Sequence, residues 1–269
     1  MQHWILSPIV IFWGTSLFFC WTDFRLGRRD KSLPAWLFFL TGWITQFVFL
    51  YMRGTAAGHC PVGTLVEVIT FMSWALAGTY LILNLFYRSN ALACYAITTT
   101  TLFQAFTLFL PRSTPSVEQW LNSAWGTIHA VLSVLAYAAF CLSALLAAMY
   151  LLKDRQLKTH QLTSGTMTFP AVTNLELWMT RVVFAGFVLF TVGLIIGFVW
   201  LENLPPARRH YDYKICWAAT VWLAYLALIL AHRFHWLRRR NAAWLCVIFT
   251  TLTLLSFWVI NTISTYHKF

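Results

Sequence analysis

Histidine side chains and a single carboxylate within apolar segments are the groups in this sequence best able to do chemistry. His129, Ser133 and Tyr137 are spaced four residues apart, and they therefore share one face of a helix. A polar stripe on an apolar helix is expected to face the interior of a helix bundle rather than lipid. An imidazole at this position can bind a metal, although the spacing alone favours a hydrogen-bonded packing contact.

A second histidine falls at a depth similar to that of His129. His267 follows Asn261 at the outer end of the last apolar run. Two neutral imidazoles at one level can occupy the axial positions of a haem iron or take part in another metal site. The alternatives are that His267 belongs to a frayed tail, or that His59 or His210 completes the site.

His232 ends the seventh apolar run, and Tyr225 lies seven residues earlier on the same helix face. One interpretation is a histidine that meets the free carbonyls at a helix C-terminus. The other is a second haem position, on the opposite side of the membrane from His129.

Glu67 is the carboxylate that falls clearly inside an apolar segment, and Trp74 is seven residues further along the same face. Glu67 can form an ion pair with an arginine at the outer side. It can equally take part in proton or ligand handling, and the sequence leaves both interpretations open.

A loop at 202–214 is rich in arginine and aromatic residues. Arg208 and Arg209 can bind carboxylates in a bidentate fashion, and aromatic rings such as Tyr211 stack on flat apolar rings. A porphyrin offers both propionates and a plane. A simple solvated loop explains the same composition.

The elements that carry these residues must lie in a membrane. The 269-residue chain is 59% hydrophobic and 10% charged, with a mean hydropathy of +0.66, whereas a soluble domain has about 45–50% apolar and roughly 25% charged residues. This composition excludes a disordered chain, a disulfide scaffold and a soluble nucleic-acid-binding protein. Because a spanning helix takes about 20 apolar residues, we expect an all-α, polytopic bundle of about eight transmembrane helices. The predicted spans are 4–21, 35–52, 63–86, 91–110, 126–151, 176–200, 215–232 and 242–264.

The basic residues predict the direction of these spans. Thirteen of the 19 Lys and Arg residues fall on one set of loops or near it, and six fall on the other set. The positive-inside rule places the larger set in the cytoplasm and both termini on the outer side. This bias accounts for most of the net charge of +11, and the cluster Arg238–Arg240 can in addition touch anionic lipid headgroups. The whole chain, 1–269, is expected to form one integral membrane domain, with no nucleic-acid partner.

Several segments resemble the cytochrome c assembly protein family, which includes CcsA/ResC-like and CcmC-like haem-handling proteins and the HemX/YpjD branch. The resemblance covers nearly all of the chain from about residue 50. The segments that carry it are Arg53 with Gly58-His59-Cys60-Pro61-Val62 and Glu67 to Trp74, Ile128 to Phe140, Tyr150 to Lys158, and Gly186 to Gly197.

The resemblance implies a set of haem-binding residues. His129 matches the first of two outer histidine ligands of the haem iron, and His267 resembles the second. His232 resembles the histidine at the inner end of the helix that follows the family's tryptophan-rich WWD segment. That segment is degenerate here: Asp212, Lys214 and Trp217 match its end, but the run of tryptophans is missing.

The resemblance therefore implies a haem-binding and haem-delivering component of c-type cytochrome biogenesis. It would carry non-covalent, b-type haem in transit and present it on the outer face to a CcsB-like subunit and an apocytochrome c. Arg208 and Arg209 would hold the propionates, and any catalysis would occur only within a holocytochrome c synthase-type complex. A non-enzymatic HemX/YpjD-like accessory or regulatory protein is the alternative. The expected location is the bacterial inner membrane or an organellar membrane.

Overall fold

The structure, a computed structural model, describes residues 6–26, 33–58, 60–87, 89–110, 123–159, 170–203 and 213–263, without the side chains of 213–214 and 257–263. These residues form helices and their connections, with no strand among them. The helices are α1 (Leu6–Arg25), α2 (Leu33–Ala57), α3 (Leu65–Phe86), α4 (Asn90–Phe106), α5 (Ala124–Lys158), α6 (Val172–Glu202), α7 (Tyr213–Arg233) and α8 (Arg239–Ile263).

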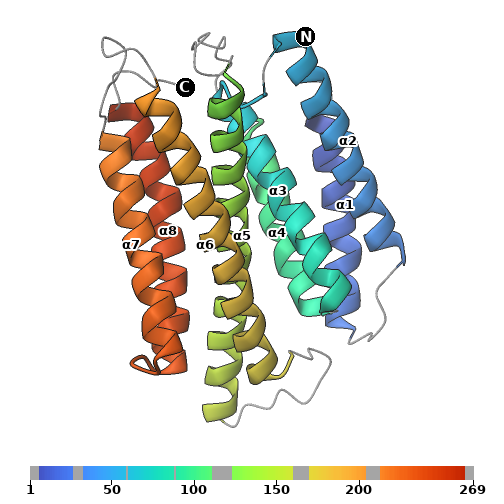
Figure 1. Ribbon diagram of the computed structural model, residues 1–269. Coiled ribbons are helices and arrows are strands. Elements are labelled where there is room, and N and C mark those ends of the chain that lie inside the picture. Colours follow the sequence, from blue (N-terminus) through green and yellow to red (C-terminus); the bar gives the residue numbers. More distant parts are fainter. Residues whose placement is uncertain are drawn as a thin grey trace.

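Consecutive helices run antiparallel, so α1 begins and α8 ends at the same end of the bundle (Figure 1). We name this end, where α3, α5 and α7 also begin, the upper end, and the opposite end the lower end. Helices α1 to α4 pack together as one half, and α6, α7 and α8 complete the other half around α5. Helix α5 joins the halves because it contacts α3 and α4 as well as α6 and α8.

Five helices in the described part of the chain are long and apolar enough to cross a membrane: Leu33–Ala57, Leu65–Phe86, Ala124–Lys158, Val172–Glu202 and Ile215–Arg233. The expected polytopic membrane bundle is therefore confirmed, and the protein is a multi-pass membrane protein. All eight predicted spans correspond to helices whose bounds differ from the prediction by a few residues. That α1, α4 and α8 also span, and that both termini lie outside, remain predictions.

Helix α5 continues seven residues beyond the predicted span of 126–151. The basic residues after that span, Lys153, Arg155 and Lys158, would lie in an inner loop if the helix ended with the span, but they lie on the last turns of this 35-residue helix. Charged residues do not stop a helix, and Lys158 Nζ lies 2.7 Å from Asp154 Oδ2 one turn earlier. Helix α5 therefore continues beyond the end of its apolar segment.

Buried polar side chains connect helices in both halves. In the first half, Gln46 Nε2 of α2 donates to the Thr70 carbonyl of α3 at 2.9 Å and to Gln104 Oε1 of α4 at 2.8 Å. In the second half, Thr250 Oγ1 of α8 donates to the Phe140 carbonyl at 3.3 Å and lies 2.9 Å from the Tyr225 hydroxyl of α7. Such bonds fix the rotation of each helix about its axis, because an unsatisfied polar group is costly inside the bundle.

The close approach of α5 and α6 depends on glycine. A Cβ atom added at Gly186 of α6 would lie 2.9 Å from the Phe140 ring and 3.1 Å from the Ala139 Cβ. On its other side the Phe140 ring stacks on Tyr225, with centroids 3.8 Å apart. The middle of α5 is therefore packed closely against α6 and, through Phe140, against α7.

Candidate functional site

His129 lies near the start of α5, at the upper end, with its ring against α6. Its Nδ1 lies 2.7 Å from the carbonyl oxygen of Gly193. A Cβ atom added at Gly197, one turn further along α6, would come within 2.5 Å of the same ring nitrogen. Two small residues spaced four apart thus make the flat surface on which the imidazole rests.

The other members of the predicted polar stripe face α6 as well. A Cβ atom at Gly193 would lie 3.4 Å from Ser133 Oγ, and the Tyr137 ring lies 5.7 Å from that of Phe190. Ser133 Oγ donates to the backbone carbonyl of His129 within its own helix, at 2.8 Å. The prediction that this face points into the bundle is confirmed.

The Gly193 contact determines which nitrogen of His129 carries the proton. A carbonyl oxygen only accepts hydrogen bonds, so Nδ1 must donate. The neutral ring then has its lone pair on Nε2, which is the usual arrangement of a metal-bound histidine whose other nitrogen bonds a backbone carbonyl. The packing contact and a metal-binding role for His129 are therefore compatible, because they would use different nitrogens.

The remaining residues predicted for the upper site can be placed only in part. Trp217 is half-buried near the start of α7 and packs against the apolar core. His267, Arg208, Arg209 and Asp212 lie outside the described residues. Within the described ranges no group of three or more His, Cys, Asp and Glu side chains is arranged to hold a metal ion, so the known part of the site offers one imidazole.

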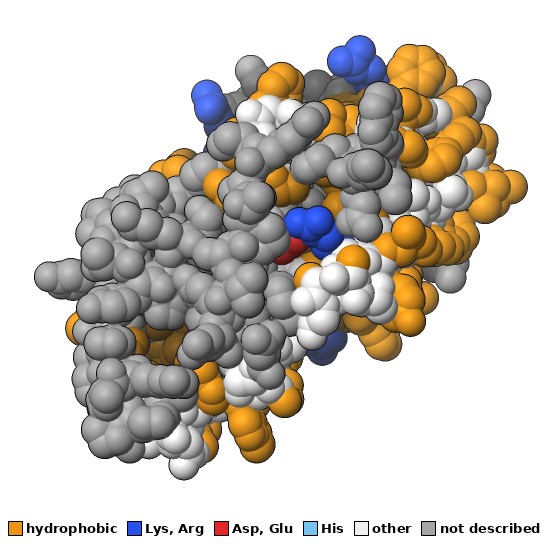
Figure 2. All heavy atoms as spheres, turned by 90° about the horizontal axis from the view of Figure 1, so that it is seen from above, with side chains coloured by type: hydrophobic (Ala, Val, Ile, Leu, Met, Phe, Trp, Pro, Cys, Tyr) orange, Lys and Arg blue, Asp and Glu red, His pale blue; other side chains and the backbone are white. Residues whose placement is uncertain are grey.

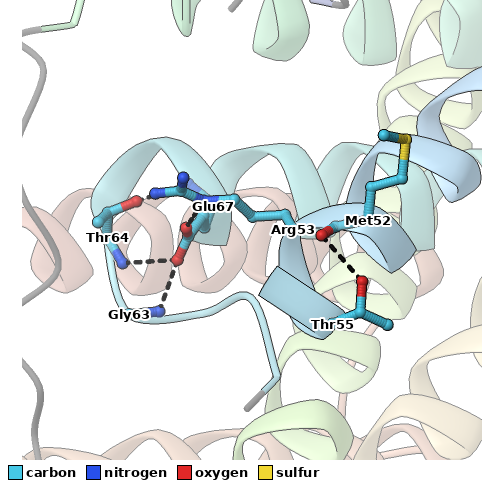
Figure 3. Close-up of polar contacts among 6 residues, drawn as sticks. All are labelled: Met52, Arg53, Thr55, Gly63, Thr64 and Glu67. Atoms are coloured by element: carbon cyan, nitrogen blue, oxygen red, sulfur yellow. Dashed lines mark hydrogen bonds and ion pairs between the residues drawn. The ribbon is translucent and has the colours of Figure 1, made fainter. Parts of the chain in front are cut away.

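Glu67 is the second predicted residue at the upper end, and Figure 3 shows its contacts. Its Oε1 lies 2.5 Å from Nε of Arg53, in the last turns of α2, and its Oε2 accepts from the backbone N–H groups of Gly63 and Thr64 at 3.0 and 3.2 Å. The Glu67 N–H in turn bonds Thr64 Oγ1 at 3.2 Å, which completes a capping box at the start of α3. The ion-pair interpretation is thus confirmed.

This ion pair is positioned where the bundle meets its surroundings. Glu67 is buried, with 3% of its side chain exposed, while 32% of the Arg53 side chain is exposed. Seen from above, an acidic and a basic side chain lie next to each other, with apolar side chains nearby (Figure 2). Every contact of Glu67 named above supports the turn between α2 and α3, so its first role is structural.

Cys60 lies in the same turn, and the Glu67 carboxylate contributes to a shift in the pKa of its thiol. Burial, and then the negative charge of Glu67, raise the pKa of the Cys60 thiol from 9.0 to about 11. The thiolate is the reactive form of cysteine. Cys60 is therefore unreactive at neutral pH.

Trp74 does not share the partners of Glu67. Its ring stacks on Trp43 of α2 with centroids 5.3 Å apart, and it also contacts Phe47 and Phe71. Its Nε1 is buried and has no hydrogen-bond partner in the described part of the chain. Trp74 belongs to the packing between α2 and α3.

At the lower end, His232 connects three helices. Its Nε2 lies 3.3 Å from Thr180 Oγ1 and 3.9 Å from Glu176 Oε1, both on α6, and the other oxygen of Glu176 lies 3.1 Å from Nη1 of Arg239 on α8. Thr180 uses its own proton to bond the Glu176 carbonyl at 2.9 Å, so it accepts from Nε2–H. Nδ1 is buried without a partner among the described residues.

Sequence reasoning anticipated neither Glu176 nor Thr180. They are one helical turn apart, in the first turns of α6, and α6 begins at the end of the bundle where α7 ends. Pairing the ends of antiparallel helices would have brought both residues to the level of His232. The expected capping of α7 carbonyls by His232 is replaced by contacts with the neighbouring helix.

The chain is similar to a known protein family and to individual proteins. The family model described as "Cytochrome C assembly protein" matches residues 62–267. Protein HemX of Brevibacillus brevis is 28% identical over 86% of this chain and 85% of its own length. The cytochrome c biogenesis protein CcsA of Guillardia theta is 30% identical over 70% of this chain and 69% of its own length. CcsA of Prochlorococcus marinus (strain MIT 9215) is 28% identical over 67% of this chain and 66% of its own length.

The matched region begins at the turn before α3 and includes both histidine sites of the bundle. It covers more than half of the chain, and it agrees with the all-helical membrane architecture. The chain therefore belongs to the cytochrome c assembly protein family, as a membrane component with a role in cytochrome c biogenesis.

Proposed function

We propose that this protein binds b-type haem non-covalently at the upper end of the bundle and delivers it for cytochrome c assembly. His129 Nε2 would be one axial ligand of the iron and His267 the other. The observation that carries the proposal is the bond from His129 Nδ1 to the Gly193 carbonyl, 2.7 Å long. It orients the ring and leaves Nε2 as the nitrogen able to bind iron.

The chain's own residues would position the haem and shield it. Arg208 and Arg209 would hold the propionates, and Asp212 and Trp217 would flank the ring as the remnant of the family's WWD segment. The haem itself supplies the chemistry of thioether formation. Any catalysis of that step would occur within a holocytochrome c synthase-type complex.

The direction of transfer follows from the predicted topology. With the upper end outside, haem would enter near His232 at the cytoplasmic end and leave near His129 and His267. A CcsB-like membrane subunit and an apocytochrome c would receive it there. The membrane would be the bacterial inner membrane or its organellar counterpart.

Absorbance spectroscopy tests this proposal. The protein purified from haem-supplied cells should show a bis-histidine haem spectrum, and His129→Ala and His267→Ala should each lower the haem content several-fold. Ser133→Ala is the matched control, because Ser133 shares the face of His129 but bonds only its own helix. A folded wild-type protein without haem, or equal haem content in all variants, would contradict haem delivery.

Gly197→Ala adds a test of the ring's position. The new Cβ would come within 2.5 Å of His129 Nδ1, so the imidazole must move although every ligand is still present. Haem content should fall, or the spectrum should shift, while the helical circular dichroism is retained. An unchanged spectrum would show that the surface of α6 does not position His129.

A second function is favoured by one observation. The HemX similarity extends over about 86% of this chain, against 67–70% for the two CcsA proteins, and the WWD segment is degenerate. The alternative is a non-enzymatic accessory or regulatory protein whose histidines serve packing. It predicts that His129→Ala lowers stability without any change in bound haem.

A further inference from the structure

The turn between α7 and α8 exposes aromatic rings between arginines. Trp236 is 77% exposed and Phe234 59% exposed, and their rings stack with centroids 5.5 Å apart. Arg233 precedes this pair, and Arg238 follows it. Large exposed apolar side chains next to basic ones are typical of the layer where a bilayer meets water.

The conformation of the turn fixes these side chains outward. His235 has a left-handed backbone with φ of 58°, and the N–H of Trp236 bonds back to the Ala231 carbonyl at 2.9 Å while that of His235 bonds the His232 carbonyl at 3.2 Å. This is a Schellman arrangement, which ends a helix sharply. Trp236 is therefore exposed on an ordered turn rather than on a frayed end.

Positive charge is concentrated around this turn. Arg233, Arg238, Arg239 and Arg240 are all exposed. Within the described part of the chain, Arg239 pairs with Glu176 and Arg240 with Asp154. Arg239 lies 3.1 Å from Glu176, and Arg240 is 3.8 Å from Asp154, which Lys158 also contacts at 2.7 Å. Two carboxylates do not balance four guanidinium groups and an ammonium, so net positive charge remains.

The start of α8 adds to the excess of positive charge around this turn. Its first turn contains no acidic residue and begins with two arginines. Cations at the positive end of a helix dipole are unfavourable. An anion from outside the chain would therefore be attracted to this turn and would reduce the repulsion between its arginines.

We propose that the α7–α8 turn binds the headgroup of an anionic phospholipid. The arginines that flank the turn, Arg233 and Arg238, contact the lipid phosphate, and Trp236 and Phe234 sit between headgroups and acyl chains. The net positive charge favours an anionic ligand. The exposed aromatic pair favours a lipid in a membrane surface over a soluble anion. This proposal does not depend on haem binding.

Nanodiscs of defined composition test the proposal. Replacing phosphatidylcholine by phosphatidylglycerol should raise the thermal unfolding midpoint of the full-length protein by several degrees. Arg238→Gln should remove most of that shift, whereas Arg25→Gln, which removes the same charge from the exposed lower end of α1, should preserve it. Because the discs contain one composition in both leaflets, the outcome is independent of topology.

Native mass spectrometry gives the second readout. Wild-type protein should retain phosphatidylglycerol at least several-fold more than Arg238→Gln does, and Trp236→Ala should lose lipid of both headgroup types. Equal midpoints in the two lipids would overturn the proposal. So would an equal loss of lipid from Arg25→Gln, or the same stabilisation of detergent-solubilised protein by inorganic phosphate.

Discussion

Glu67 shows how one side chain can connect two helices of a membrane bundle. Its two oxygens contact the Arg53 side chain and two backbone N–H groups. A buried carboxylate with three donors has hydrogen-bond partners for both of its oxygens. The fold therefore explains why a charged residue is tolerated near an apolar segment.

Replacing this carboxylate tests its role. Glu67→Gln removes the charge that pairs with Arg53 but retains most of the side chain's shape. We expect the free energy of unfolding, measured by reversible SDS titration, to fall by about 1–3 kcal/mol. Thr64→Ala, which removes only the cap of α3, should cost about 1 kcal/mol. Equal stability of Glu67→Gln and wild type would show that the ion pair contributes nothing.

The Cys60 thiol predicts a pH dependence. Its pKa is about 11 in the folded protein and 9.0 without the fold's influence. Between these values the folded state binds the extra proton, so stability falls as pH rises from about 9 to 11, by at most about 1.4 kcal/mol per pH unit. Below pH 9 this group contributes no pH dependence.

Alkylation of a variant that retains only Cys60 measures this shift. The rate should rise with pH up to about pH 11. Glu67→Gln should move the profile to lower pH, because a negative charge that disfavours the thiolate is removed. A profile centred near 9 in the parent would contradict the effect of burial.

The role of Glu67 was partly visible in the sequence. The motif Thr64-Leu-Val-Glu67 has the spacing of a capping box, so the cap of α3 could have been predicted from it. The partner Arg53 belongs to the preceding helix, and its reach depends on how α2 and α3 pack. His232 is the opposite case: its depth was predictable, but its contact with Thr180 depends on helix rotation, which sequence patterns do not specify.

The C-terminus of α7 determines how the chain turns into α8. Helix α7 ends in a Schellman arrangement with a histidine at the left-handed position. Glycine is the usual residue there, because side chains with a Cβ atom are strained at positive φ. No glycine marks this turn in the sequence, yet the predicted end of the span at residue 232 is within one residue of the end of α7, because apolar length alone located it.

His235→Gly should therefore stabilise the protein. Relief of backbone strain is worth about 1 kcal/mol, and the His235 side chain is exposed. The unfolding midpoint in detergent should rise. His235→Ala is the matched control: it removes the same imidazole but retains a Cβ, and it should leave the midpoint unchanged. A rise in both variants would instead assign the effect to the side chain.

The whole molecule consists of two four-helix halves that meet at α5. Length and composition predicted this all-helical membrane bundle well, because hydrophobic spans follow from the thickness of the bilayer. They did not predict which helices touch. The contacts between α5 and α6 depend on glycines such as Gly186 and Gly193, whose meaning emerges only when the two helices are seen together.

For the whole molecule, we predict its orientation in the membrane. The distribution of Lys and Arg places both termini and the upper end outside. Alkaline phosphatase fused after residue 269 should be active, and green fluorescent protein at the same place should be dark. Fusions after residue 159, at the lower end, should give the reverse result. Active phosphatase at residue 159 would invert the assigned orientation and, with it, the direction of haem transfer.

Helix α5 has a consequence for communication across the membrane. Its 35 residues extend about 52 Å at 1.5 Å per residue, beyond the roughly 30 Å of hydrocarbon, and no glycine or proline follows Gly126 in it. Proline and glycine are common points at which helices kink, so their absence from the rest of α5 favours a continuous helix. His129 near the upper end and Asp154 near the lower end therefore belong to one continuous helix. A ligand that bound the imidazole and tilted α5 would therefore also displace the contacts of Asp154 with Lys158 and Arg240 at the lower end.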